Sequence, residues 1–384
     1  MKYIAKMMLA LLASVTMVAQ AYAWDFSASG SASANWVQKT VTPASGDGTT
    51  SANFSGSSGG VSLKSGHTDG DKSLTLTYTA DVDTDGTQSS GAGDAGGSAG
   101  LDQTLSLAGS TKVGKWTSSA TASQSLMEDG VTSKISSDDS AAITITDGSI
   151  TYKLGNTSHL STAEKTAGTT AGGAQDAEAR VDGFNGFSVG LPVGPGALTF
   201  AVDMNSGTAS TLMGDKSVAI ACGGQMTGFG FNFAGDVGAD LSFTYATGSS
   251  TASKANCTGD NASNSASANT MGLGVAIPMG TITLALDYES TATNSKVGDT
   301  ETKVTSGGFE VSVQASDIAD GTVTLNISSA SSKTGDNDPA TTAGTELGWK
   351  TSIGATSLEV AYGSAAVKDG NTTTEIEVEM SLSF

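Results

Sequence analysis

The sequence predicts an all-β protein, a transmembrane antiparallel β-barrel of about 16–18 strands with short periplasmic turns and long extracellular loops. Three observations predict it. Alternating apolar and polar residues recur along the chain, the links between them alternate in length, and the chain opens with an export signal. Strict alternation is the period of a strand, because successive side chains point to opposite faces of a sheet.

Residues 1–23 form the expected signal peptide. Two lysines precede an apolar run that begins at Met7, and the tripeptide that ends at Ala23 has the small-x-small pattern of a signal peptidase site. The run is shorter than the roughly 20 residues of a spanning helix. We therefore expect a mature chain, 24–384, that is exported and forms the barrel.

The composition favours many strands built from small residues. The chain has 50 Gly, only 5 Pro and 6% aromatic residues, which does not suit an ordinary helical or α/β domain. Its formal net charge of −20 opposes binding to nucleic acid. We also expect no enzyme activity, because no residue is placed to perform a bond-making step.

The strands follow from the alternation, taken in chain order. In the run SLTLTYTA, for example, Leu74, Leu76 and Tyr78 alternate with polar residues. Weaker candidates, diluted with Ser, Ala and Gly, lie at 24–37, 56–65 and 116–127. Strong runs lie at 73–80, 101–109, 141–146, 149–155, 187–194, 197–204, 228–235, 240–246, 272–278, 281–289, 309–315, 322–328, 347–354, 357–363 and 375–384.

The links alternate in length, and this favours a membrane barrel over a soluble sandwich. Short links such as those at 147–148, 194–196 and 279–280 alternate with long polar ones, except for the short final link at 368–371. An even number of strands returns the chain to its starting side and leaves no edge, as hydrocarbon requires. The expected long links are 39–55, 81–98, 128–138, 156–183, 205–222, 247–268, 290–304 and 329–345.

The terminal run EIEVEMSLSF carries a family resemblance. Its apolar residues share one face and its carboxylates the other, and the chain ends in Phe384. It resembles the last strand of Gram-negative outer-membrane proteins, whose terminal aromatic is read by the insertion machinery. The segment 147–190 is similar to porins of the general diffusion type, in which a strand ending in Leu-Gly leads into a loop folded back into the lumen. The resemblance implies that residues 156–183 form such a constriction loop.

The phase of each strand assigns residues to the lumen, because aliphatic and aromatic residues are assigned to lipid. Arg180 is the only arginine of the chain, so the chain lacks the arginine wall of well-known porins. Carboxylates outnumber basic groups, and this favours a weak preference for cations. The strand residues assigned to the lumen are Lys64, Lys153, Asp203, Asp287, Glu289, Glu310, Lys350, Glu359, Glu375, Glu377 and Glu379, and the loop adds Glu164, Lys165, Asp176, Glu178, Arg180 and Asp182.

Three smaller patterns give further hypotheses. Asp81, Asp83 and Asp85 have the spacing of a calcium loop, but position twelve is Ala92, so they form only a weak calcium candidate. Cys222 and Cys257 are the only cysteines, and both fall in predicted outer loops of an exported chain. We expect a disulfide between them, against two free thiols as the alternative.

A further pair, His159 and Ser161, lies two residues apart, as in a nucleophile and its base. The residues around it do not otherwise match the barrel phospholipases, so a polar pair at the base of a loop is the preferred interpretation.

These patterns predict an outer-membrane porin for passive diffusion of small hydrophilic solutes and ions. The expected partners are outer-membrane lipid, the insertion machinery and those solutes, with no cofactor apart from the weak calcium candidate; the resemblance implies a homotrimer. Two alternatives remain open. One is a substrate-specific channel of 18 strands, and the other is a structural or adhesive surface β-protein.

Overall fold

The fold is described from a computed structural model of the chain. No helix among the described residues is long and apolar enough to cross a membrane. The expected signal peptide and both cysteines lie outside the described residues. The structure describes residues 24–83, 100–128, 131–132, 140–157, 159–161, 163–169, 185–207, 224–252 and 264–384.

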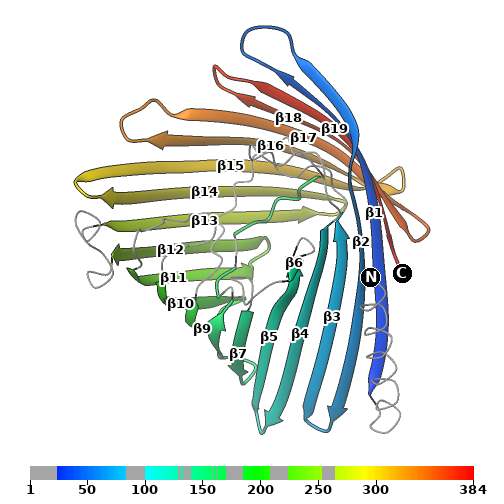
Figure 1. Cartoon of the computed structure of the whole chain (residues 1–384), viewed down its shortest axis with the longest axis vertical. Helices are drawn as coiled ribbons and strands as arrows, with labels where there is room; N and C mark the ends of the chain where they lie inside the picture. The colour runs from blue at the N-terminus through cyan, green and yellow to red at the C-terminus, as the bar shows by residue number, and fades with distance from the viewer. Residues whose placement is uncertain are drawn as a thin grey trace. The chain divides into compact units, whose positions relative to one another are not determined.

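The described chain is built from antiparallel strands (Figure 1). There are nineteen in these residues, and β6 is a two-residue strand that pairs only with the end of β5, so eighteen long strands remain. Eighteen is the upper end of the predicted range. The strands are β1 (Asp25–Thr42), β2 (Thr49–Asp69), β3 (Lys72–Asp83), β4 (Gly100–Val113), β5 (Trp116–Glu128), β6 (Val131–Thr132), β7 (Ser140–Thr146), β8 (Thr151–Asn156), β9 (Asn185–Val193), β10 (Gly196–Gly207), β11 (Gly224–Asp236), β12 (Asp240–Ala252), β13 (Ser265–Met279), β14 (Ile282–Val297), β15 (Thr300–Ile318), β16 (Gly321–Thr334), β17 (Ala340–Ile353), β18 (Thr356–Val367) and β19 (Thr372–Ser383).

The strands belong to two compact units, each described by itself. Unit 1 comprises residues up to 33, 56–148 and 382–384, and unit 2 comprises 34–55 and 149–381. In unit 1, β2 to β5 pair in chain order and β5 then pairs with β7. In unit 2, β8 to β18 pair in chain order, each antiparallel to the next.

The first strand, β1, pairs with both β2 and the last strand, β19. In unit 1, the Gly30 N–H donates to the Phe384 carbonyl at 2.7 Å, and the Phe384 N–H donates back to Gly30 at 2.9 Å. In unit 2, Asn35 Nδ2 donates to Glu377 Oε1 at 2.8 Å. The predicted pairing of the terminal strand with the first strand is thus present in the structure.

The short links are tight turns that depend on residues in the left-handed region. Most use a glycine, because this backbone conformation costs other residues about 1–2 kcal/mol. The turn between β15 and β16 instead uses Ala319 and Asp320, with φ of 50° and 57°. The turn glycines are Gly70, Gly114, Gly194, Gly238, Gly280 and Gly354, with φ between 57° and 92°.

Three of the links expected to be long loops are hairpins instead. Strands β14 and β15 continue to Val297 and Thr300, so the expected loop 290–304 is a tight turn at the end of two long strands. The expected loop 39–55 is likewise reduced to residues 43–48, between β1 and β2. The expected loop 329–345 is reduced to residues 335–339, between β16 and β17. The prediction of long loops is wrong at these places, because polar residues continue the backbone ladder.

Candidate functional site

On the unit 2 sheet, small and polar side chains are buried and large apolar side chains are exposed. This is the reverse of the pattern in a soluble protein. On β13, Ala266, Ala268 and Thr270 are buried, whereas Met271, which follows them and points to the opposite face, is 37% exposed. We call the face that carries the buried residues the inner face. The opposite, outer face exposes large apolar side chains on strand after strand, which is typical of a surface in contact with lipid.

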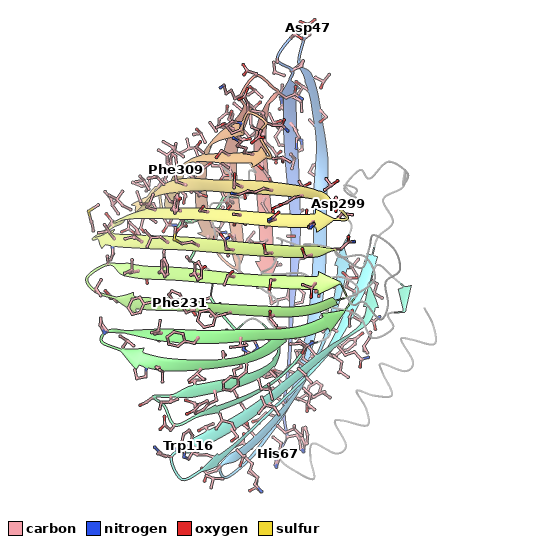
Figure 2. All side chains as sticks on the ribbon, turned by 90° about the vertical axis from the view of Figure 1, so that its left-hand side faces the viewer. Asp47, His67, Trp116, Phe231, Asp299 and Phe309 are labelled. Atoms are coloured by element: carbon pink, nitrogen blue, oxygen red, sulfur yellow. The ribbon has the colours of Figure 1, made fainter. Side chains whose placement is uncertain are left out.

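The outer face of β10 to β12 carries a cluster of aromatic rings. Phe231 lies at its centre, with ring centroids 6.2 Å from Phe200, 5.7 Å from Phe243 and 5.7 Å from Tyr245. Figure 2 shows Phe231 and Phe309 on the same side of the sheet. Such rings, on the outer face of a sheet whose other face is polar, suit an apolar environment and its boundary with water.

The inner face of unit 2 is covered by a loop that follows β8. We call its described residues, 159–161 and 163–169, the inner loop. Leu160 and Ala163 are 4% and 1% exposed, although the loop has no regular secondary structure. Its contacts reach β9, β11, β12, β14, β16 and β17, which places the loop along the inner wall. The resemblance implies such a position for residues 156–183, and of these 156 belongs to β8.

Asp287 on β14 is the strongest anchor of the inner loop. The Lys165 N–H donates to both carboxylate oxygens of Asp287, at 2.8 and 2.9 Å. The N–H and the hydroxyl of Thr166 both donate to Asp287 Oδ2, at 2.7 and 2.6 Å. Asp287 is 1% exposed, so these donors replace the water that the carboxylate has lost.

A second anchor holds the far end of the described loop. Thr169 Oγ1 donates to Glu346 Oε2 on β17 at 2.9 Å, and Asn326 Nδ2 on β16 donates to the Ala167 carbonyl at 2.6 Å. Asn326 Nδ2 also lies 3.3 Å from Glu346 Oε2. The Asn326 amide thus binds the main chain of the loop, and the Glu346 carboxylate binds one of its side chains.

The near end of the inner loop is fixed by His159 and Ser161. His159 Nε2 lies 2.9 Å from the Gly155 carbonyl and its Nδ1 lies 2.9 Å from Ser188 Oγ. Because a carbonyl only accepts, Nε2 carries the proton in the neutral ring and Nδ1 accepts from Ser188. The Ser161 hydroxyl instead accepts from Asn232 Nδ2 at 2.8 Å. His159 and Ser161 therefore have separate partners that hold the loop, unlike a nucleophile and its base.

Burial holds the pKa of His159 below its ordinary value. The hydrogen bond to Gly155 opposes this effect, and the positive charge of Lys153 lowers the pKa further. The neutral ring is therefore the form that the docked loop favours.

Glycines in the wall make room for the loop. A Cβ on Gly274 would collide with the Ala163 carbonyl, and one on Gly230 would collide with the Leu160 side chain. A Cβ on Gly348 would lie 2.9 Å from Thr169 Cγ2. Glycine weakens a strand interior, so these positions indicate a close approach of the loop backbone to the wall.

The inner face of unit 2 carries a band of carboxylates from β14 to β19. Asp287 and Glu310 lie directly opposite each other in the β14–β15 register, and Glu310 is 3% exposed. Like charges placed so are destabilising unless other groups compensate, and the loop N–H groups do so at Asp287. The members of this acidic band are Asp287, Glu289, Glu310, Glu346, Glu359, Glu375, Glu377 and Glu379.

Three lysines of unit 2 form ion pairs with carboxylates along the inner face. Lys350 Nζ lies 3.0 Å from Glu359 Oε2, and these two residues are direct cross-strand neighbours. Lys165 Nζ lies 2.8 Å from Asp240 Oδ2, and Lys39 Nζ lies 3.6 Å from Glu375 Oε2. The half-buried Lys153 lies opposite Ser188 on β9, beside His159.

Unit 1 presents a face of hydroxyl groups instead. The Oγ atoms of Ser73 and Ser110 are hydrogen-bonded at 2.7 Å, and those of Ser106 and Ser123 at 2.9 Å. The phase of β2 puts Lys64 on this same face, opposite Thr77 in the register. The other face exposes apolar residues such as Leu107 and Ile143. Unit 1 thus repeats the polar and apolar faces of unit 2 with far fewer charges.

The terminal Phe384 packs on β1 in unit 1. A Cβ on Gly30 would lie 2.6 Å from Cζ of the Phe384 ring, so a side chain at residue 30 would displace the ring from its present position. Phe384 remains 73% exposed. The aromatic terminus therefore combines backbone pairing with an accessible ring.

The remaining predicted residues are placed as follows. Asp81 and Asp83 lie in β3, an extended strand, and not in a loop as the calcium pattern requires, while Asp85 falls outside the described residues. No group of three or more His, Cys, Asp or Glu side chains suited to a metal occurs in the described residues. Asp203 lies in β10 opposite Gly186 and Gly228, and Glu164 is exposed in the inner loop. Asp176, Glu178, Arg180, Asp182, Cys222 and Cys257 lie outside the described residues.

The sequence reasoning did not single out Glu346, Asn326 or Asn232. Glu346 and Lys350 are four residues apart in one strand, so the phase that assigned Lys350 to the lumen would also have included Glu346. The two asparagines carry no charge and resemble the many other polar residues of their strands. Only their contacts with the inner loop distinguish them.

Comparison with known proteins supports the fold alone. No protein-family profile matches the sequence, and neither does any curated protein. Among solved structures, the chain is similar to an anion-selective porin from Comamonas acidovorans, with 13% identity, a TM-score of 0.51 and coverage of 94% of this chain and 100% of that one.

Two further solved structures agree. The outer membrane channel DcaP of Acinetobacter baumannii gives a TM-score of 0.53 at 10% identity, covering 94% of this chain and 97% of that one. OpdL of Pseudomonas aeruginosa gives 0.54 at 10% identity, covering 94% and 99%. Together with the eighteen long antiparallel strands, this likeness confirms the predicted fold. The chain has the antiparallel β-barrel fold of the outer-membrane porins.

Proposed function

We propose that the protein is an outer-membrane porin that lets small hydrophilic solutes and ions diffuse through a water-filled lumen. One observation carries the proposal: the unit 2 sheet has an apolar, exposed outer face and a polar, charged inner face on which a loop is seated. A wall of this kind suits lipid on one side and water on the other. The loop narrows the water-filled side and so limits the size of the solutes.

The acidic band supports a weak preference for cations. Fixed carboxylates along a lumen raise the local concentration of cations and lower that of anions. Several band members are paired, Glu359 with Lys350 and Glu375 with Lys39, which reduces their net effect. The preference should therefore be weak. The similar porin from Comamonas acidovorans is described as anion-selective, so selectivity must be measured for this chain.

The test is single-channel recording of the purified, folded protein in planar bilayers, with the reversal potential measured under a salt gradient. We expect discrete conductance steps and a cation-selective reversal potential. Replacing Glu310 and Glu346 by Gln should move the reversal potential towards zero. Silence from correctly folded protein would refute the porin proposal and favour a plugged or structural barrel, and an anion-selective potential would refute the cation preference alone.

We further propose that the chain reaches the outer membrane after removal of residues 1–23 and assembles as a homotrimer. Amino-terminal sequencing of the protein from outer membranes should begin at Trp24. Native mass spectrometry in detergent should give three times the mass of one mature chain, and a single-chain mass would refute the trimer. Deletion of Phe384 should lower the amount of folded protein in the membrane, because the insertion machinery is expected to read it.

A further inference from the structure

A cavity of about 510 Å³ lies in unit 2 between the end of the inner loop and the inner face of β15 to β18. Gly168 and Thr169 of the loop form one side, and Lys350 and Glu359 of β17 and β18 form part of the other. Its volume falls within the range of ligand pockets, about 300–1,000 Å³. The cavity is therefore large enough to hold a small solute.

The cavity contains charges of both signs at fixed places. Lys350 Nζ contacts Glu359 Oε2 at 3.0 Å, yet the Lys350 side chain is 63% exposed, so further ammonium donors remain accessible to a solute. Asp320 adds a second carboxylate to the lining. The site thus offers one cationic and two anionic groups.

The backbone fixes where these groups lie. Lys350 and Glu359 are direct cross-strand neighbours, so their pairing is set by the register of β17 and β18. Asp320 occupies the left-handed turn position, and its carbonyl accepts from Thr351 Oγ1 at 2.7 Å. Thr169 is held over the cavity by its bond to Glu346. A preorganised arrangement of this kind lowers the ordering cost of binding.

The uncharged lining is also polar. Gln314, Thr324 and Ser357 are among the residues that surround the charges, and none of the described lining residues is aromatic or aliphatic. Apolar contact therefore contributes little to holding a solute there. Charge contacts and hydrogen bonds must do so, which favours a small solute that carries both signs of charge.

We infer that this cavity is a transient binding site for small zwitterions of amino-acid or dipeptide size. The carboxylate of the solute contacts the Lys350 ammonium, and its ammonium contacts a carboxylate of the lining, that of Glu359 or that of Asp320. The inference rests on the proposed porin function and names a solute class for it. Binding must stay weak, because a solute held tightly would not leave the channel.

The test compares permeation of four alanine derivatives of similar size into liposomes that contain the protein. The solutes are the zwitterion alanylalanine, the neutral N-acetylalaninamide, the anion N-acetylalanine and the cation alanylalaninamide. We expect the wild-type channel to pass the zwitterion faster than the neutral analogue. K350Q and E359Q should each lower the zwitterion-to-neutral ratio roughly two- to fivefold, as expected for loss of one exposed charge contact.

The matched controls are K39Q and E375Q, which alter another ion pair of the inner face by the same charge. They should leave the ratio unchanged. The double variant K350E/E359K keeps both charges in the cavity and should recover most of the ratio that K350Q loses. Equal ratios in K350Q and K39Q would overturn the inference. A wild-type channel that passes the cation alanylalaninamide faster than the neutral analogue, but does not pass the zwitterion faster, would overturn it as well.

Conductance in potassium chloride separates the two proposals. Channels that conduct normally but show no dependence on Lys350 or Glu359 overturn the zwitterion site and leave the porin function intact. Absence of conductance in folded protein overturns both.

Discussion

Replacement of Asp287 by Ala should release the inner loop from the wall. The buried carboxylate accepts from three donors of the loop, the N–H groups of Lys165 and Thr166 and the Thr166 hydroxyl, through four contacts of 2.6–2.9 Å. A hydrogen bond to a charged group contributes about 1.5–3 kcal/mol. D287A removes all of these contacts at once, because no other side chain replaces the carboxylate.

The net effect is smaller than the sum of these bonds. Water in the lumen can hydrate the freed N–H groups once the loop lifts, so we expect docking to weaken by about 2–4 kcal/mol. This corresponds to a rise of about 30- to 900-fold in the ratio of undocked to docked loop. The Asp287→Asn variant keeps one acceptor oxygen and should fall between the wild type and D287A.

Two measurements report the release. Open-channel current noise in planar bilayers should rise as the loop moves in and out of the lumen. Trypsin should cleave after Lys165, and mass spectrometry should detect the fragment that ends there. E289Q is the matched control, since Glu289 lies on the same face of β14, two residues from Asp287. Wild-type noise and cleavage in D287A, or the same changes in E289Q, would refute this account of the anchor.

Three other predictions concern a wall glycine, the inner-loop histidine and the two cysteines. Gly274→Ala should displace the loop and increase cleavage after the loop lysine, whereas Gly190→Ala, whose Cβ would make an ordinary 3.5 Å contact with a neighbouring hydroxyl, should not. Because the folded protein lowers the pKa of His159, its contribution to docking is full above the ordinary value of 6.5 and is lost as pH falls through the lowered pKa; current noise should therefore rise on acidification, and less in H159Q. The predicted disulfide between Cys222 and Cys257 should make the non-reduced protein lighter by two hydrogens and protect it from iodoacetamide, and labelling of both thiols would contradict it.

The faces of the strands were predictable because large apolar residues on these strands alternate with small or polar ones, and the two sets lie on opposite faces of a sheet. Phase alone put Asp287, Glu310 and Glu359 on one face, and the structure shows them buried on the face that carries the loop. The long hairpins were not predictable in this way. In 290–304 both faces of the strands carry polar residues, so the hydrophobic alternation ends while the backbone ladder continues to Val297.

The contacts that hold the inner loop on the wall could not be predicted from the sequence, for a different reason. Phase says that Asp287 faces inwards, but it does not say that its partners are Lys165 and Thr166, more than a hundred positions earlier in the chain. A carboxylate that accepts from peptide N–H groups needs no particular partner side chain. The identity of residue 165 therefore does not indicate that its main-chain N–H binds Asp287.

The wall glycines under the loop impose a joint constraint on two distant parts of the sequence. At Gly274, Gly230 and Gly348 any side chain would occupy the volume that the loop now fills. A related chain with Ala or Ser at Gly274 must shift the loop backbone, and one with Ala or Ser at Gly230 or Gly348 must move a loop side chain. In the proposed porin, three strand positions that are distant from the loop in the sequence therefore help to set the width of the passage. Among related chains these positions should vary together with the sequence of residues 159–169, a pattern that would reveal pore size without a structure.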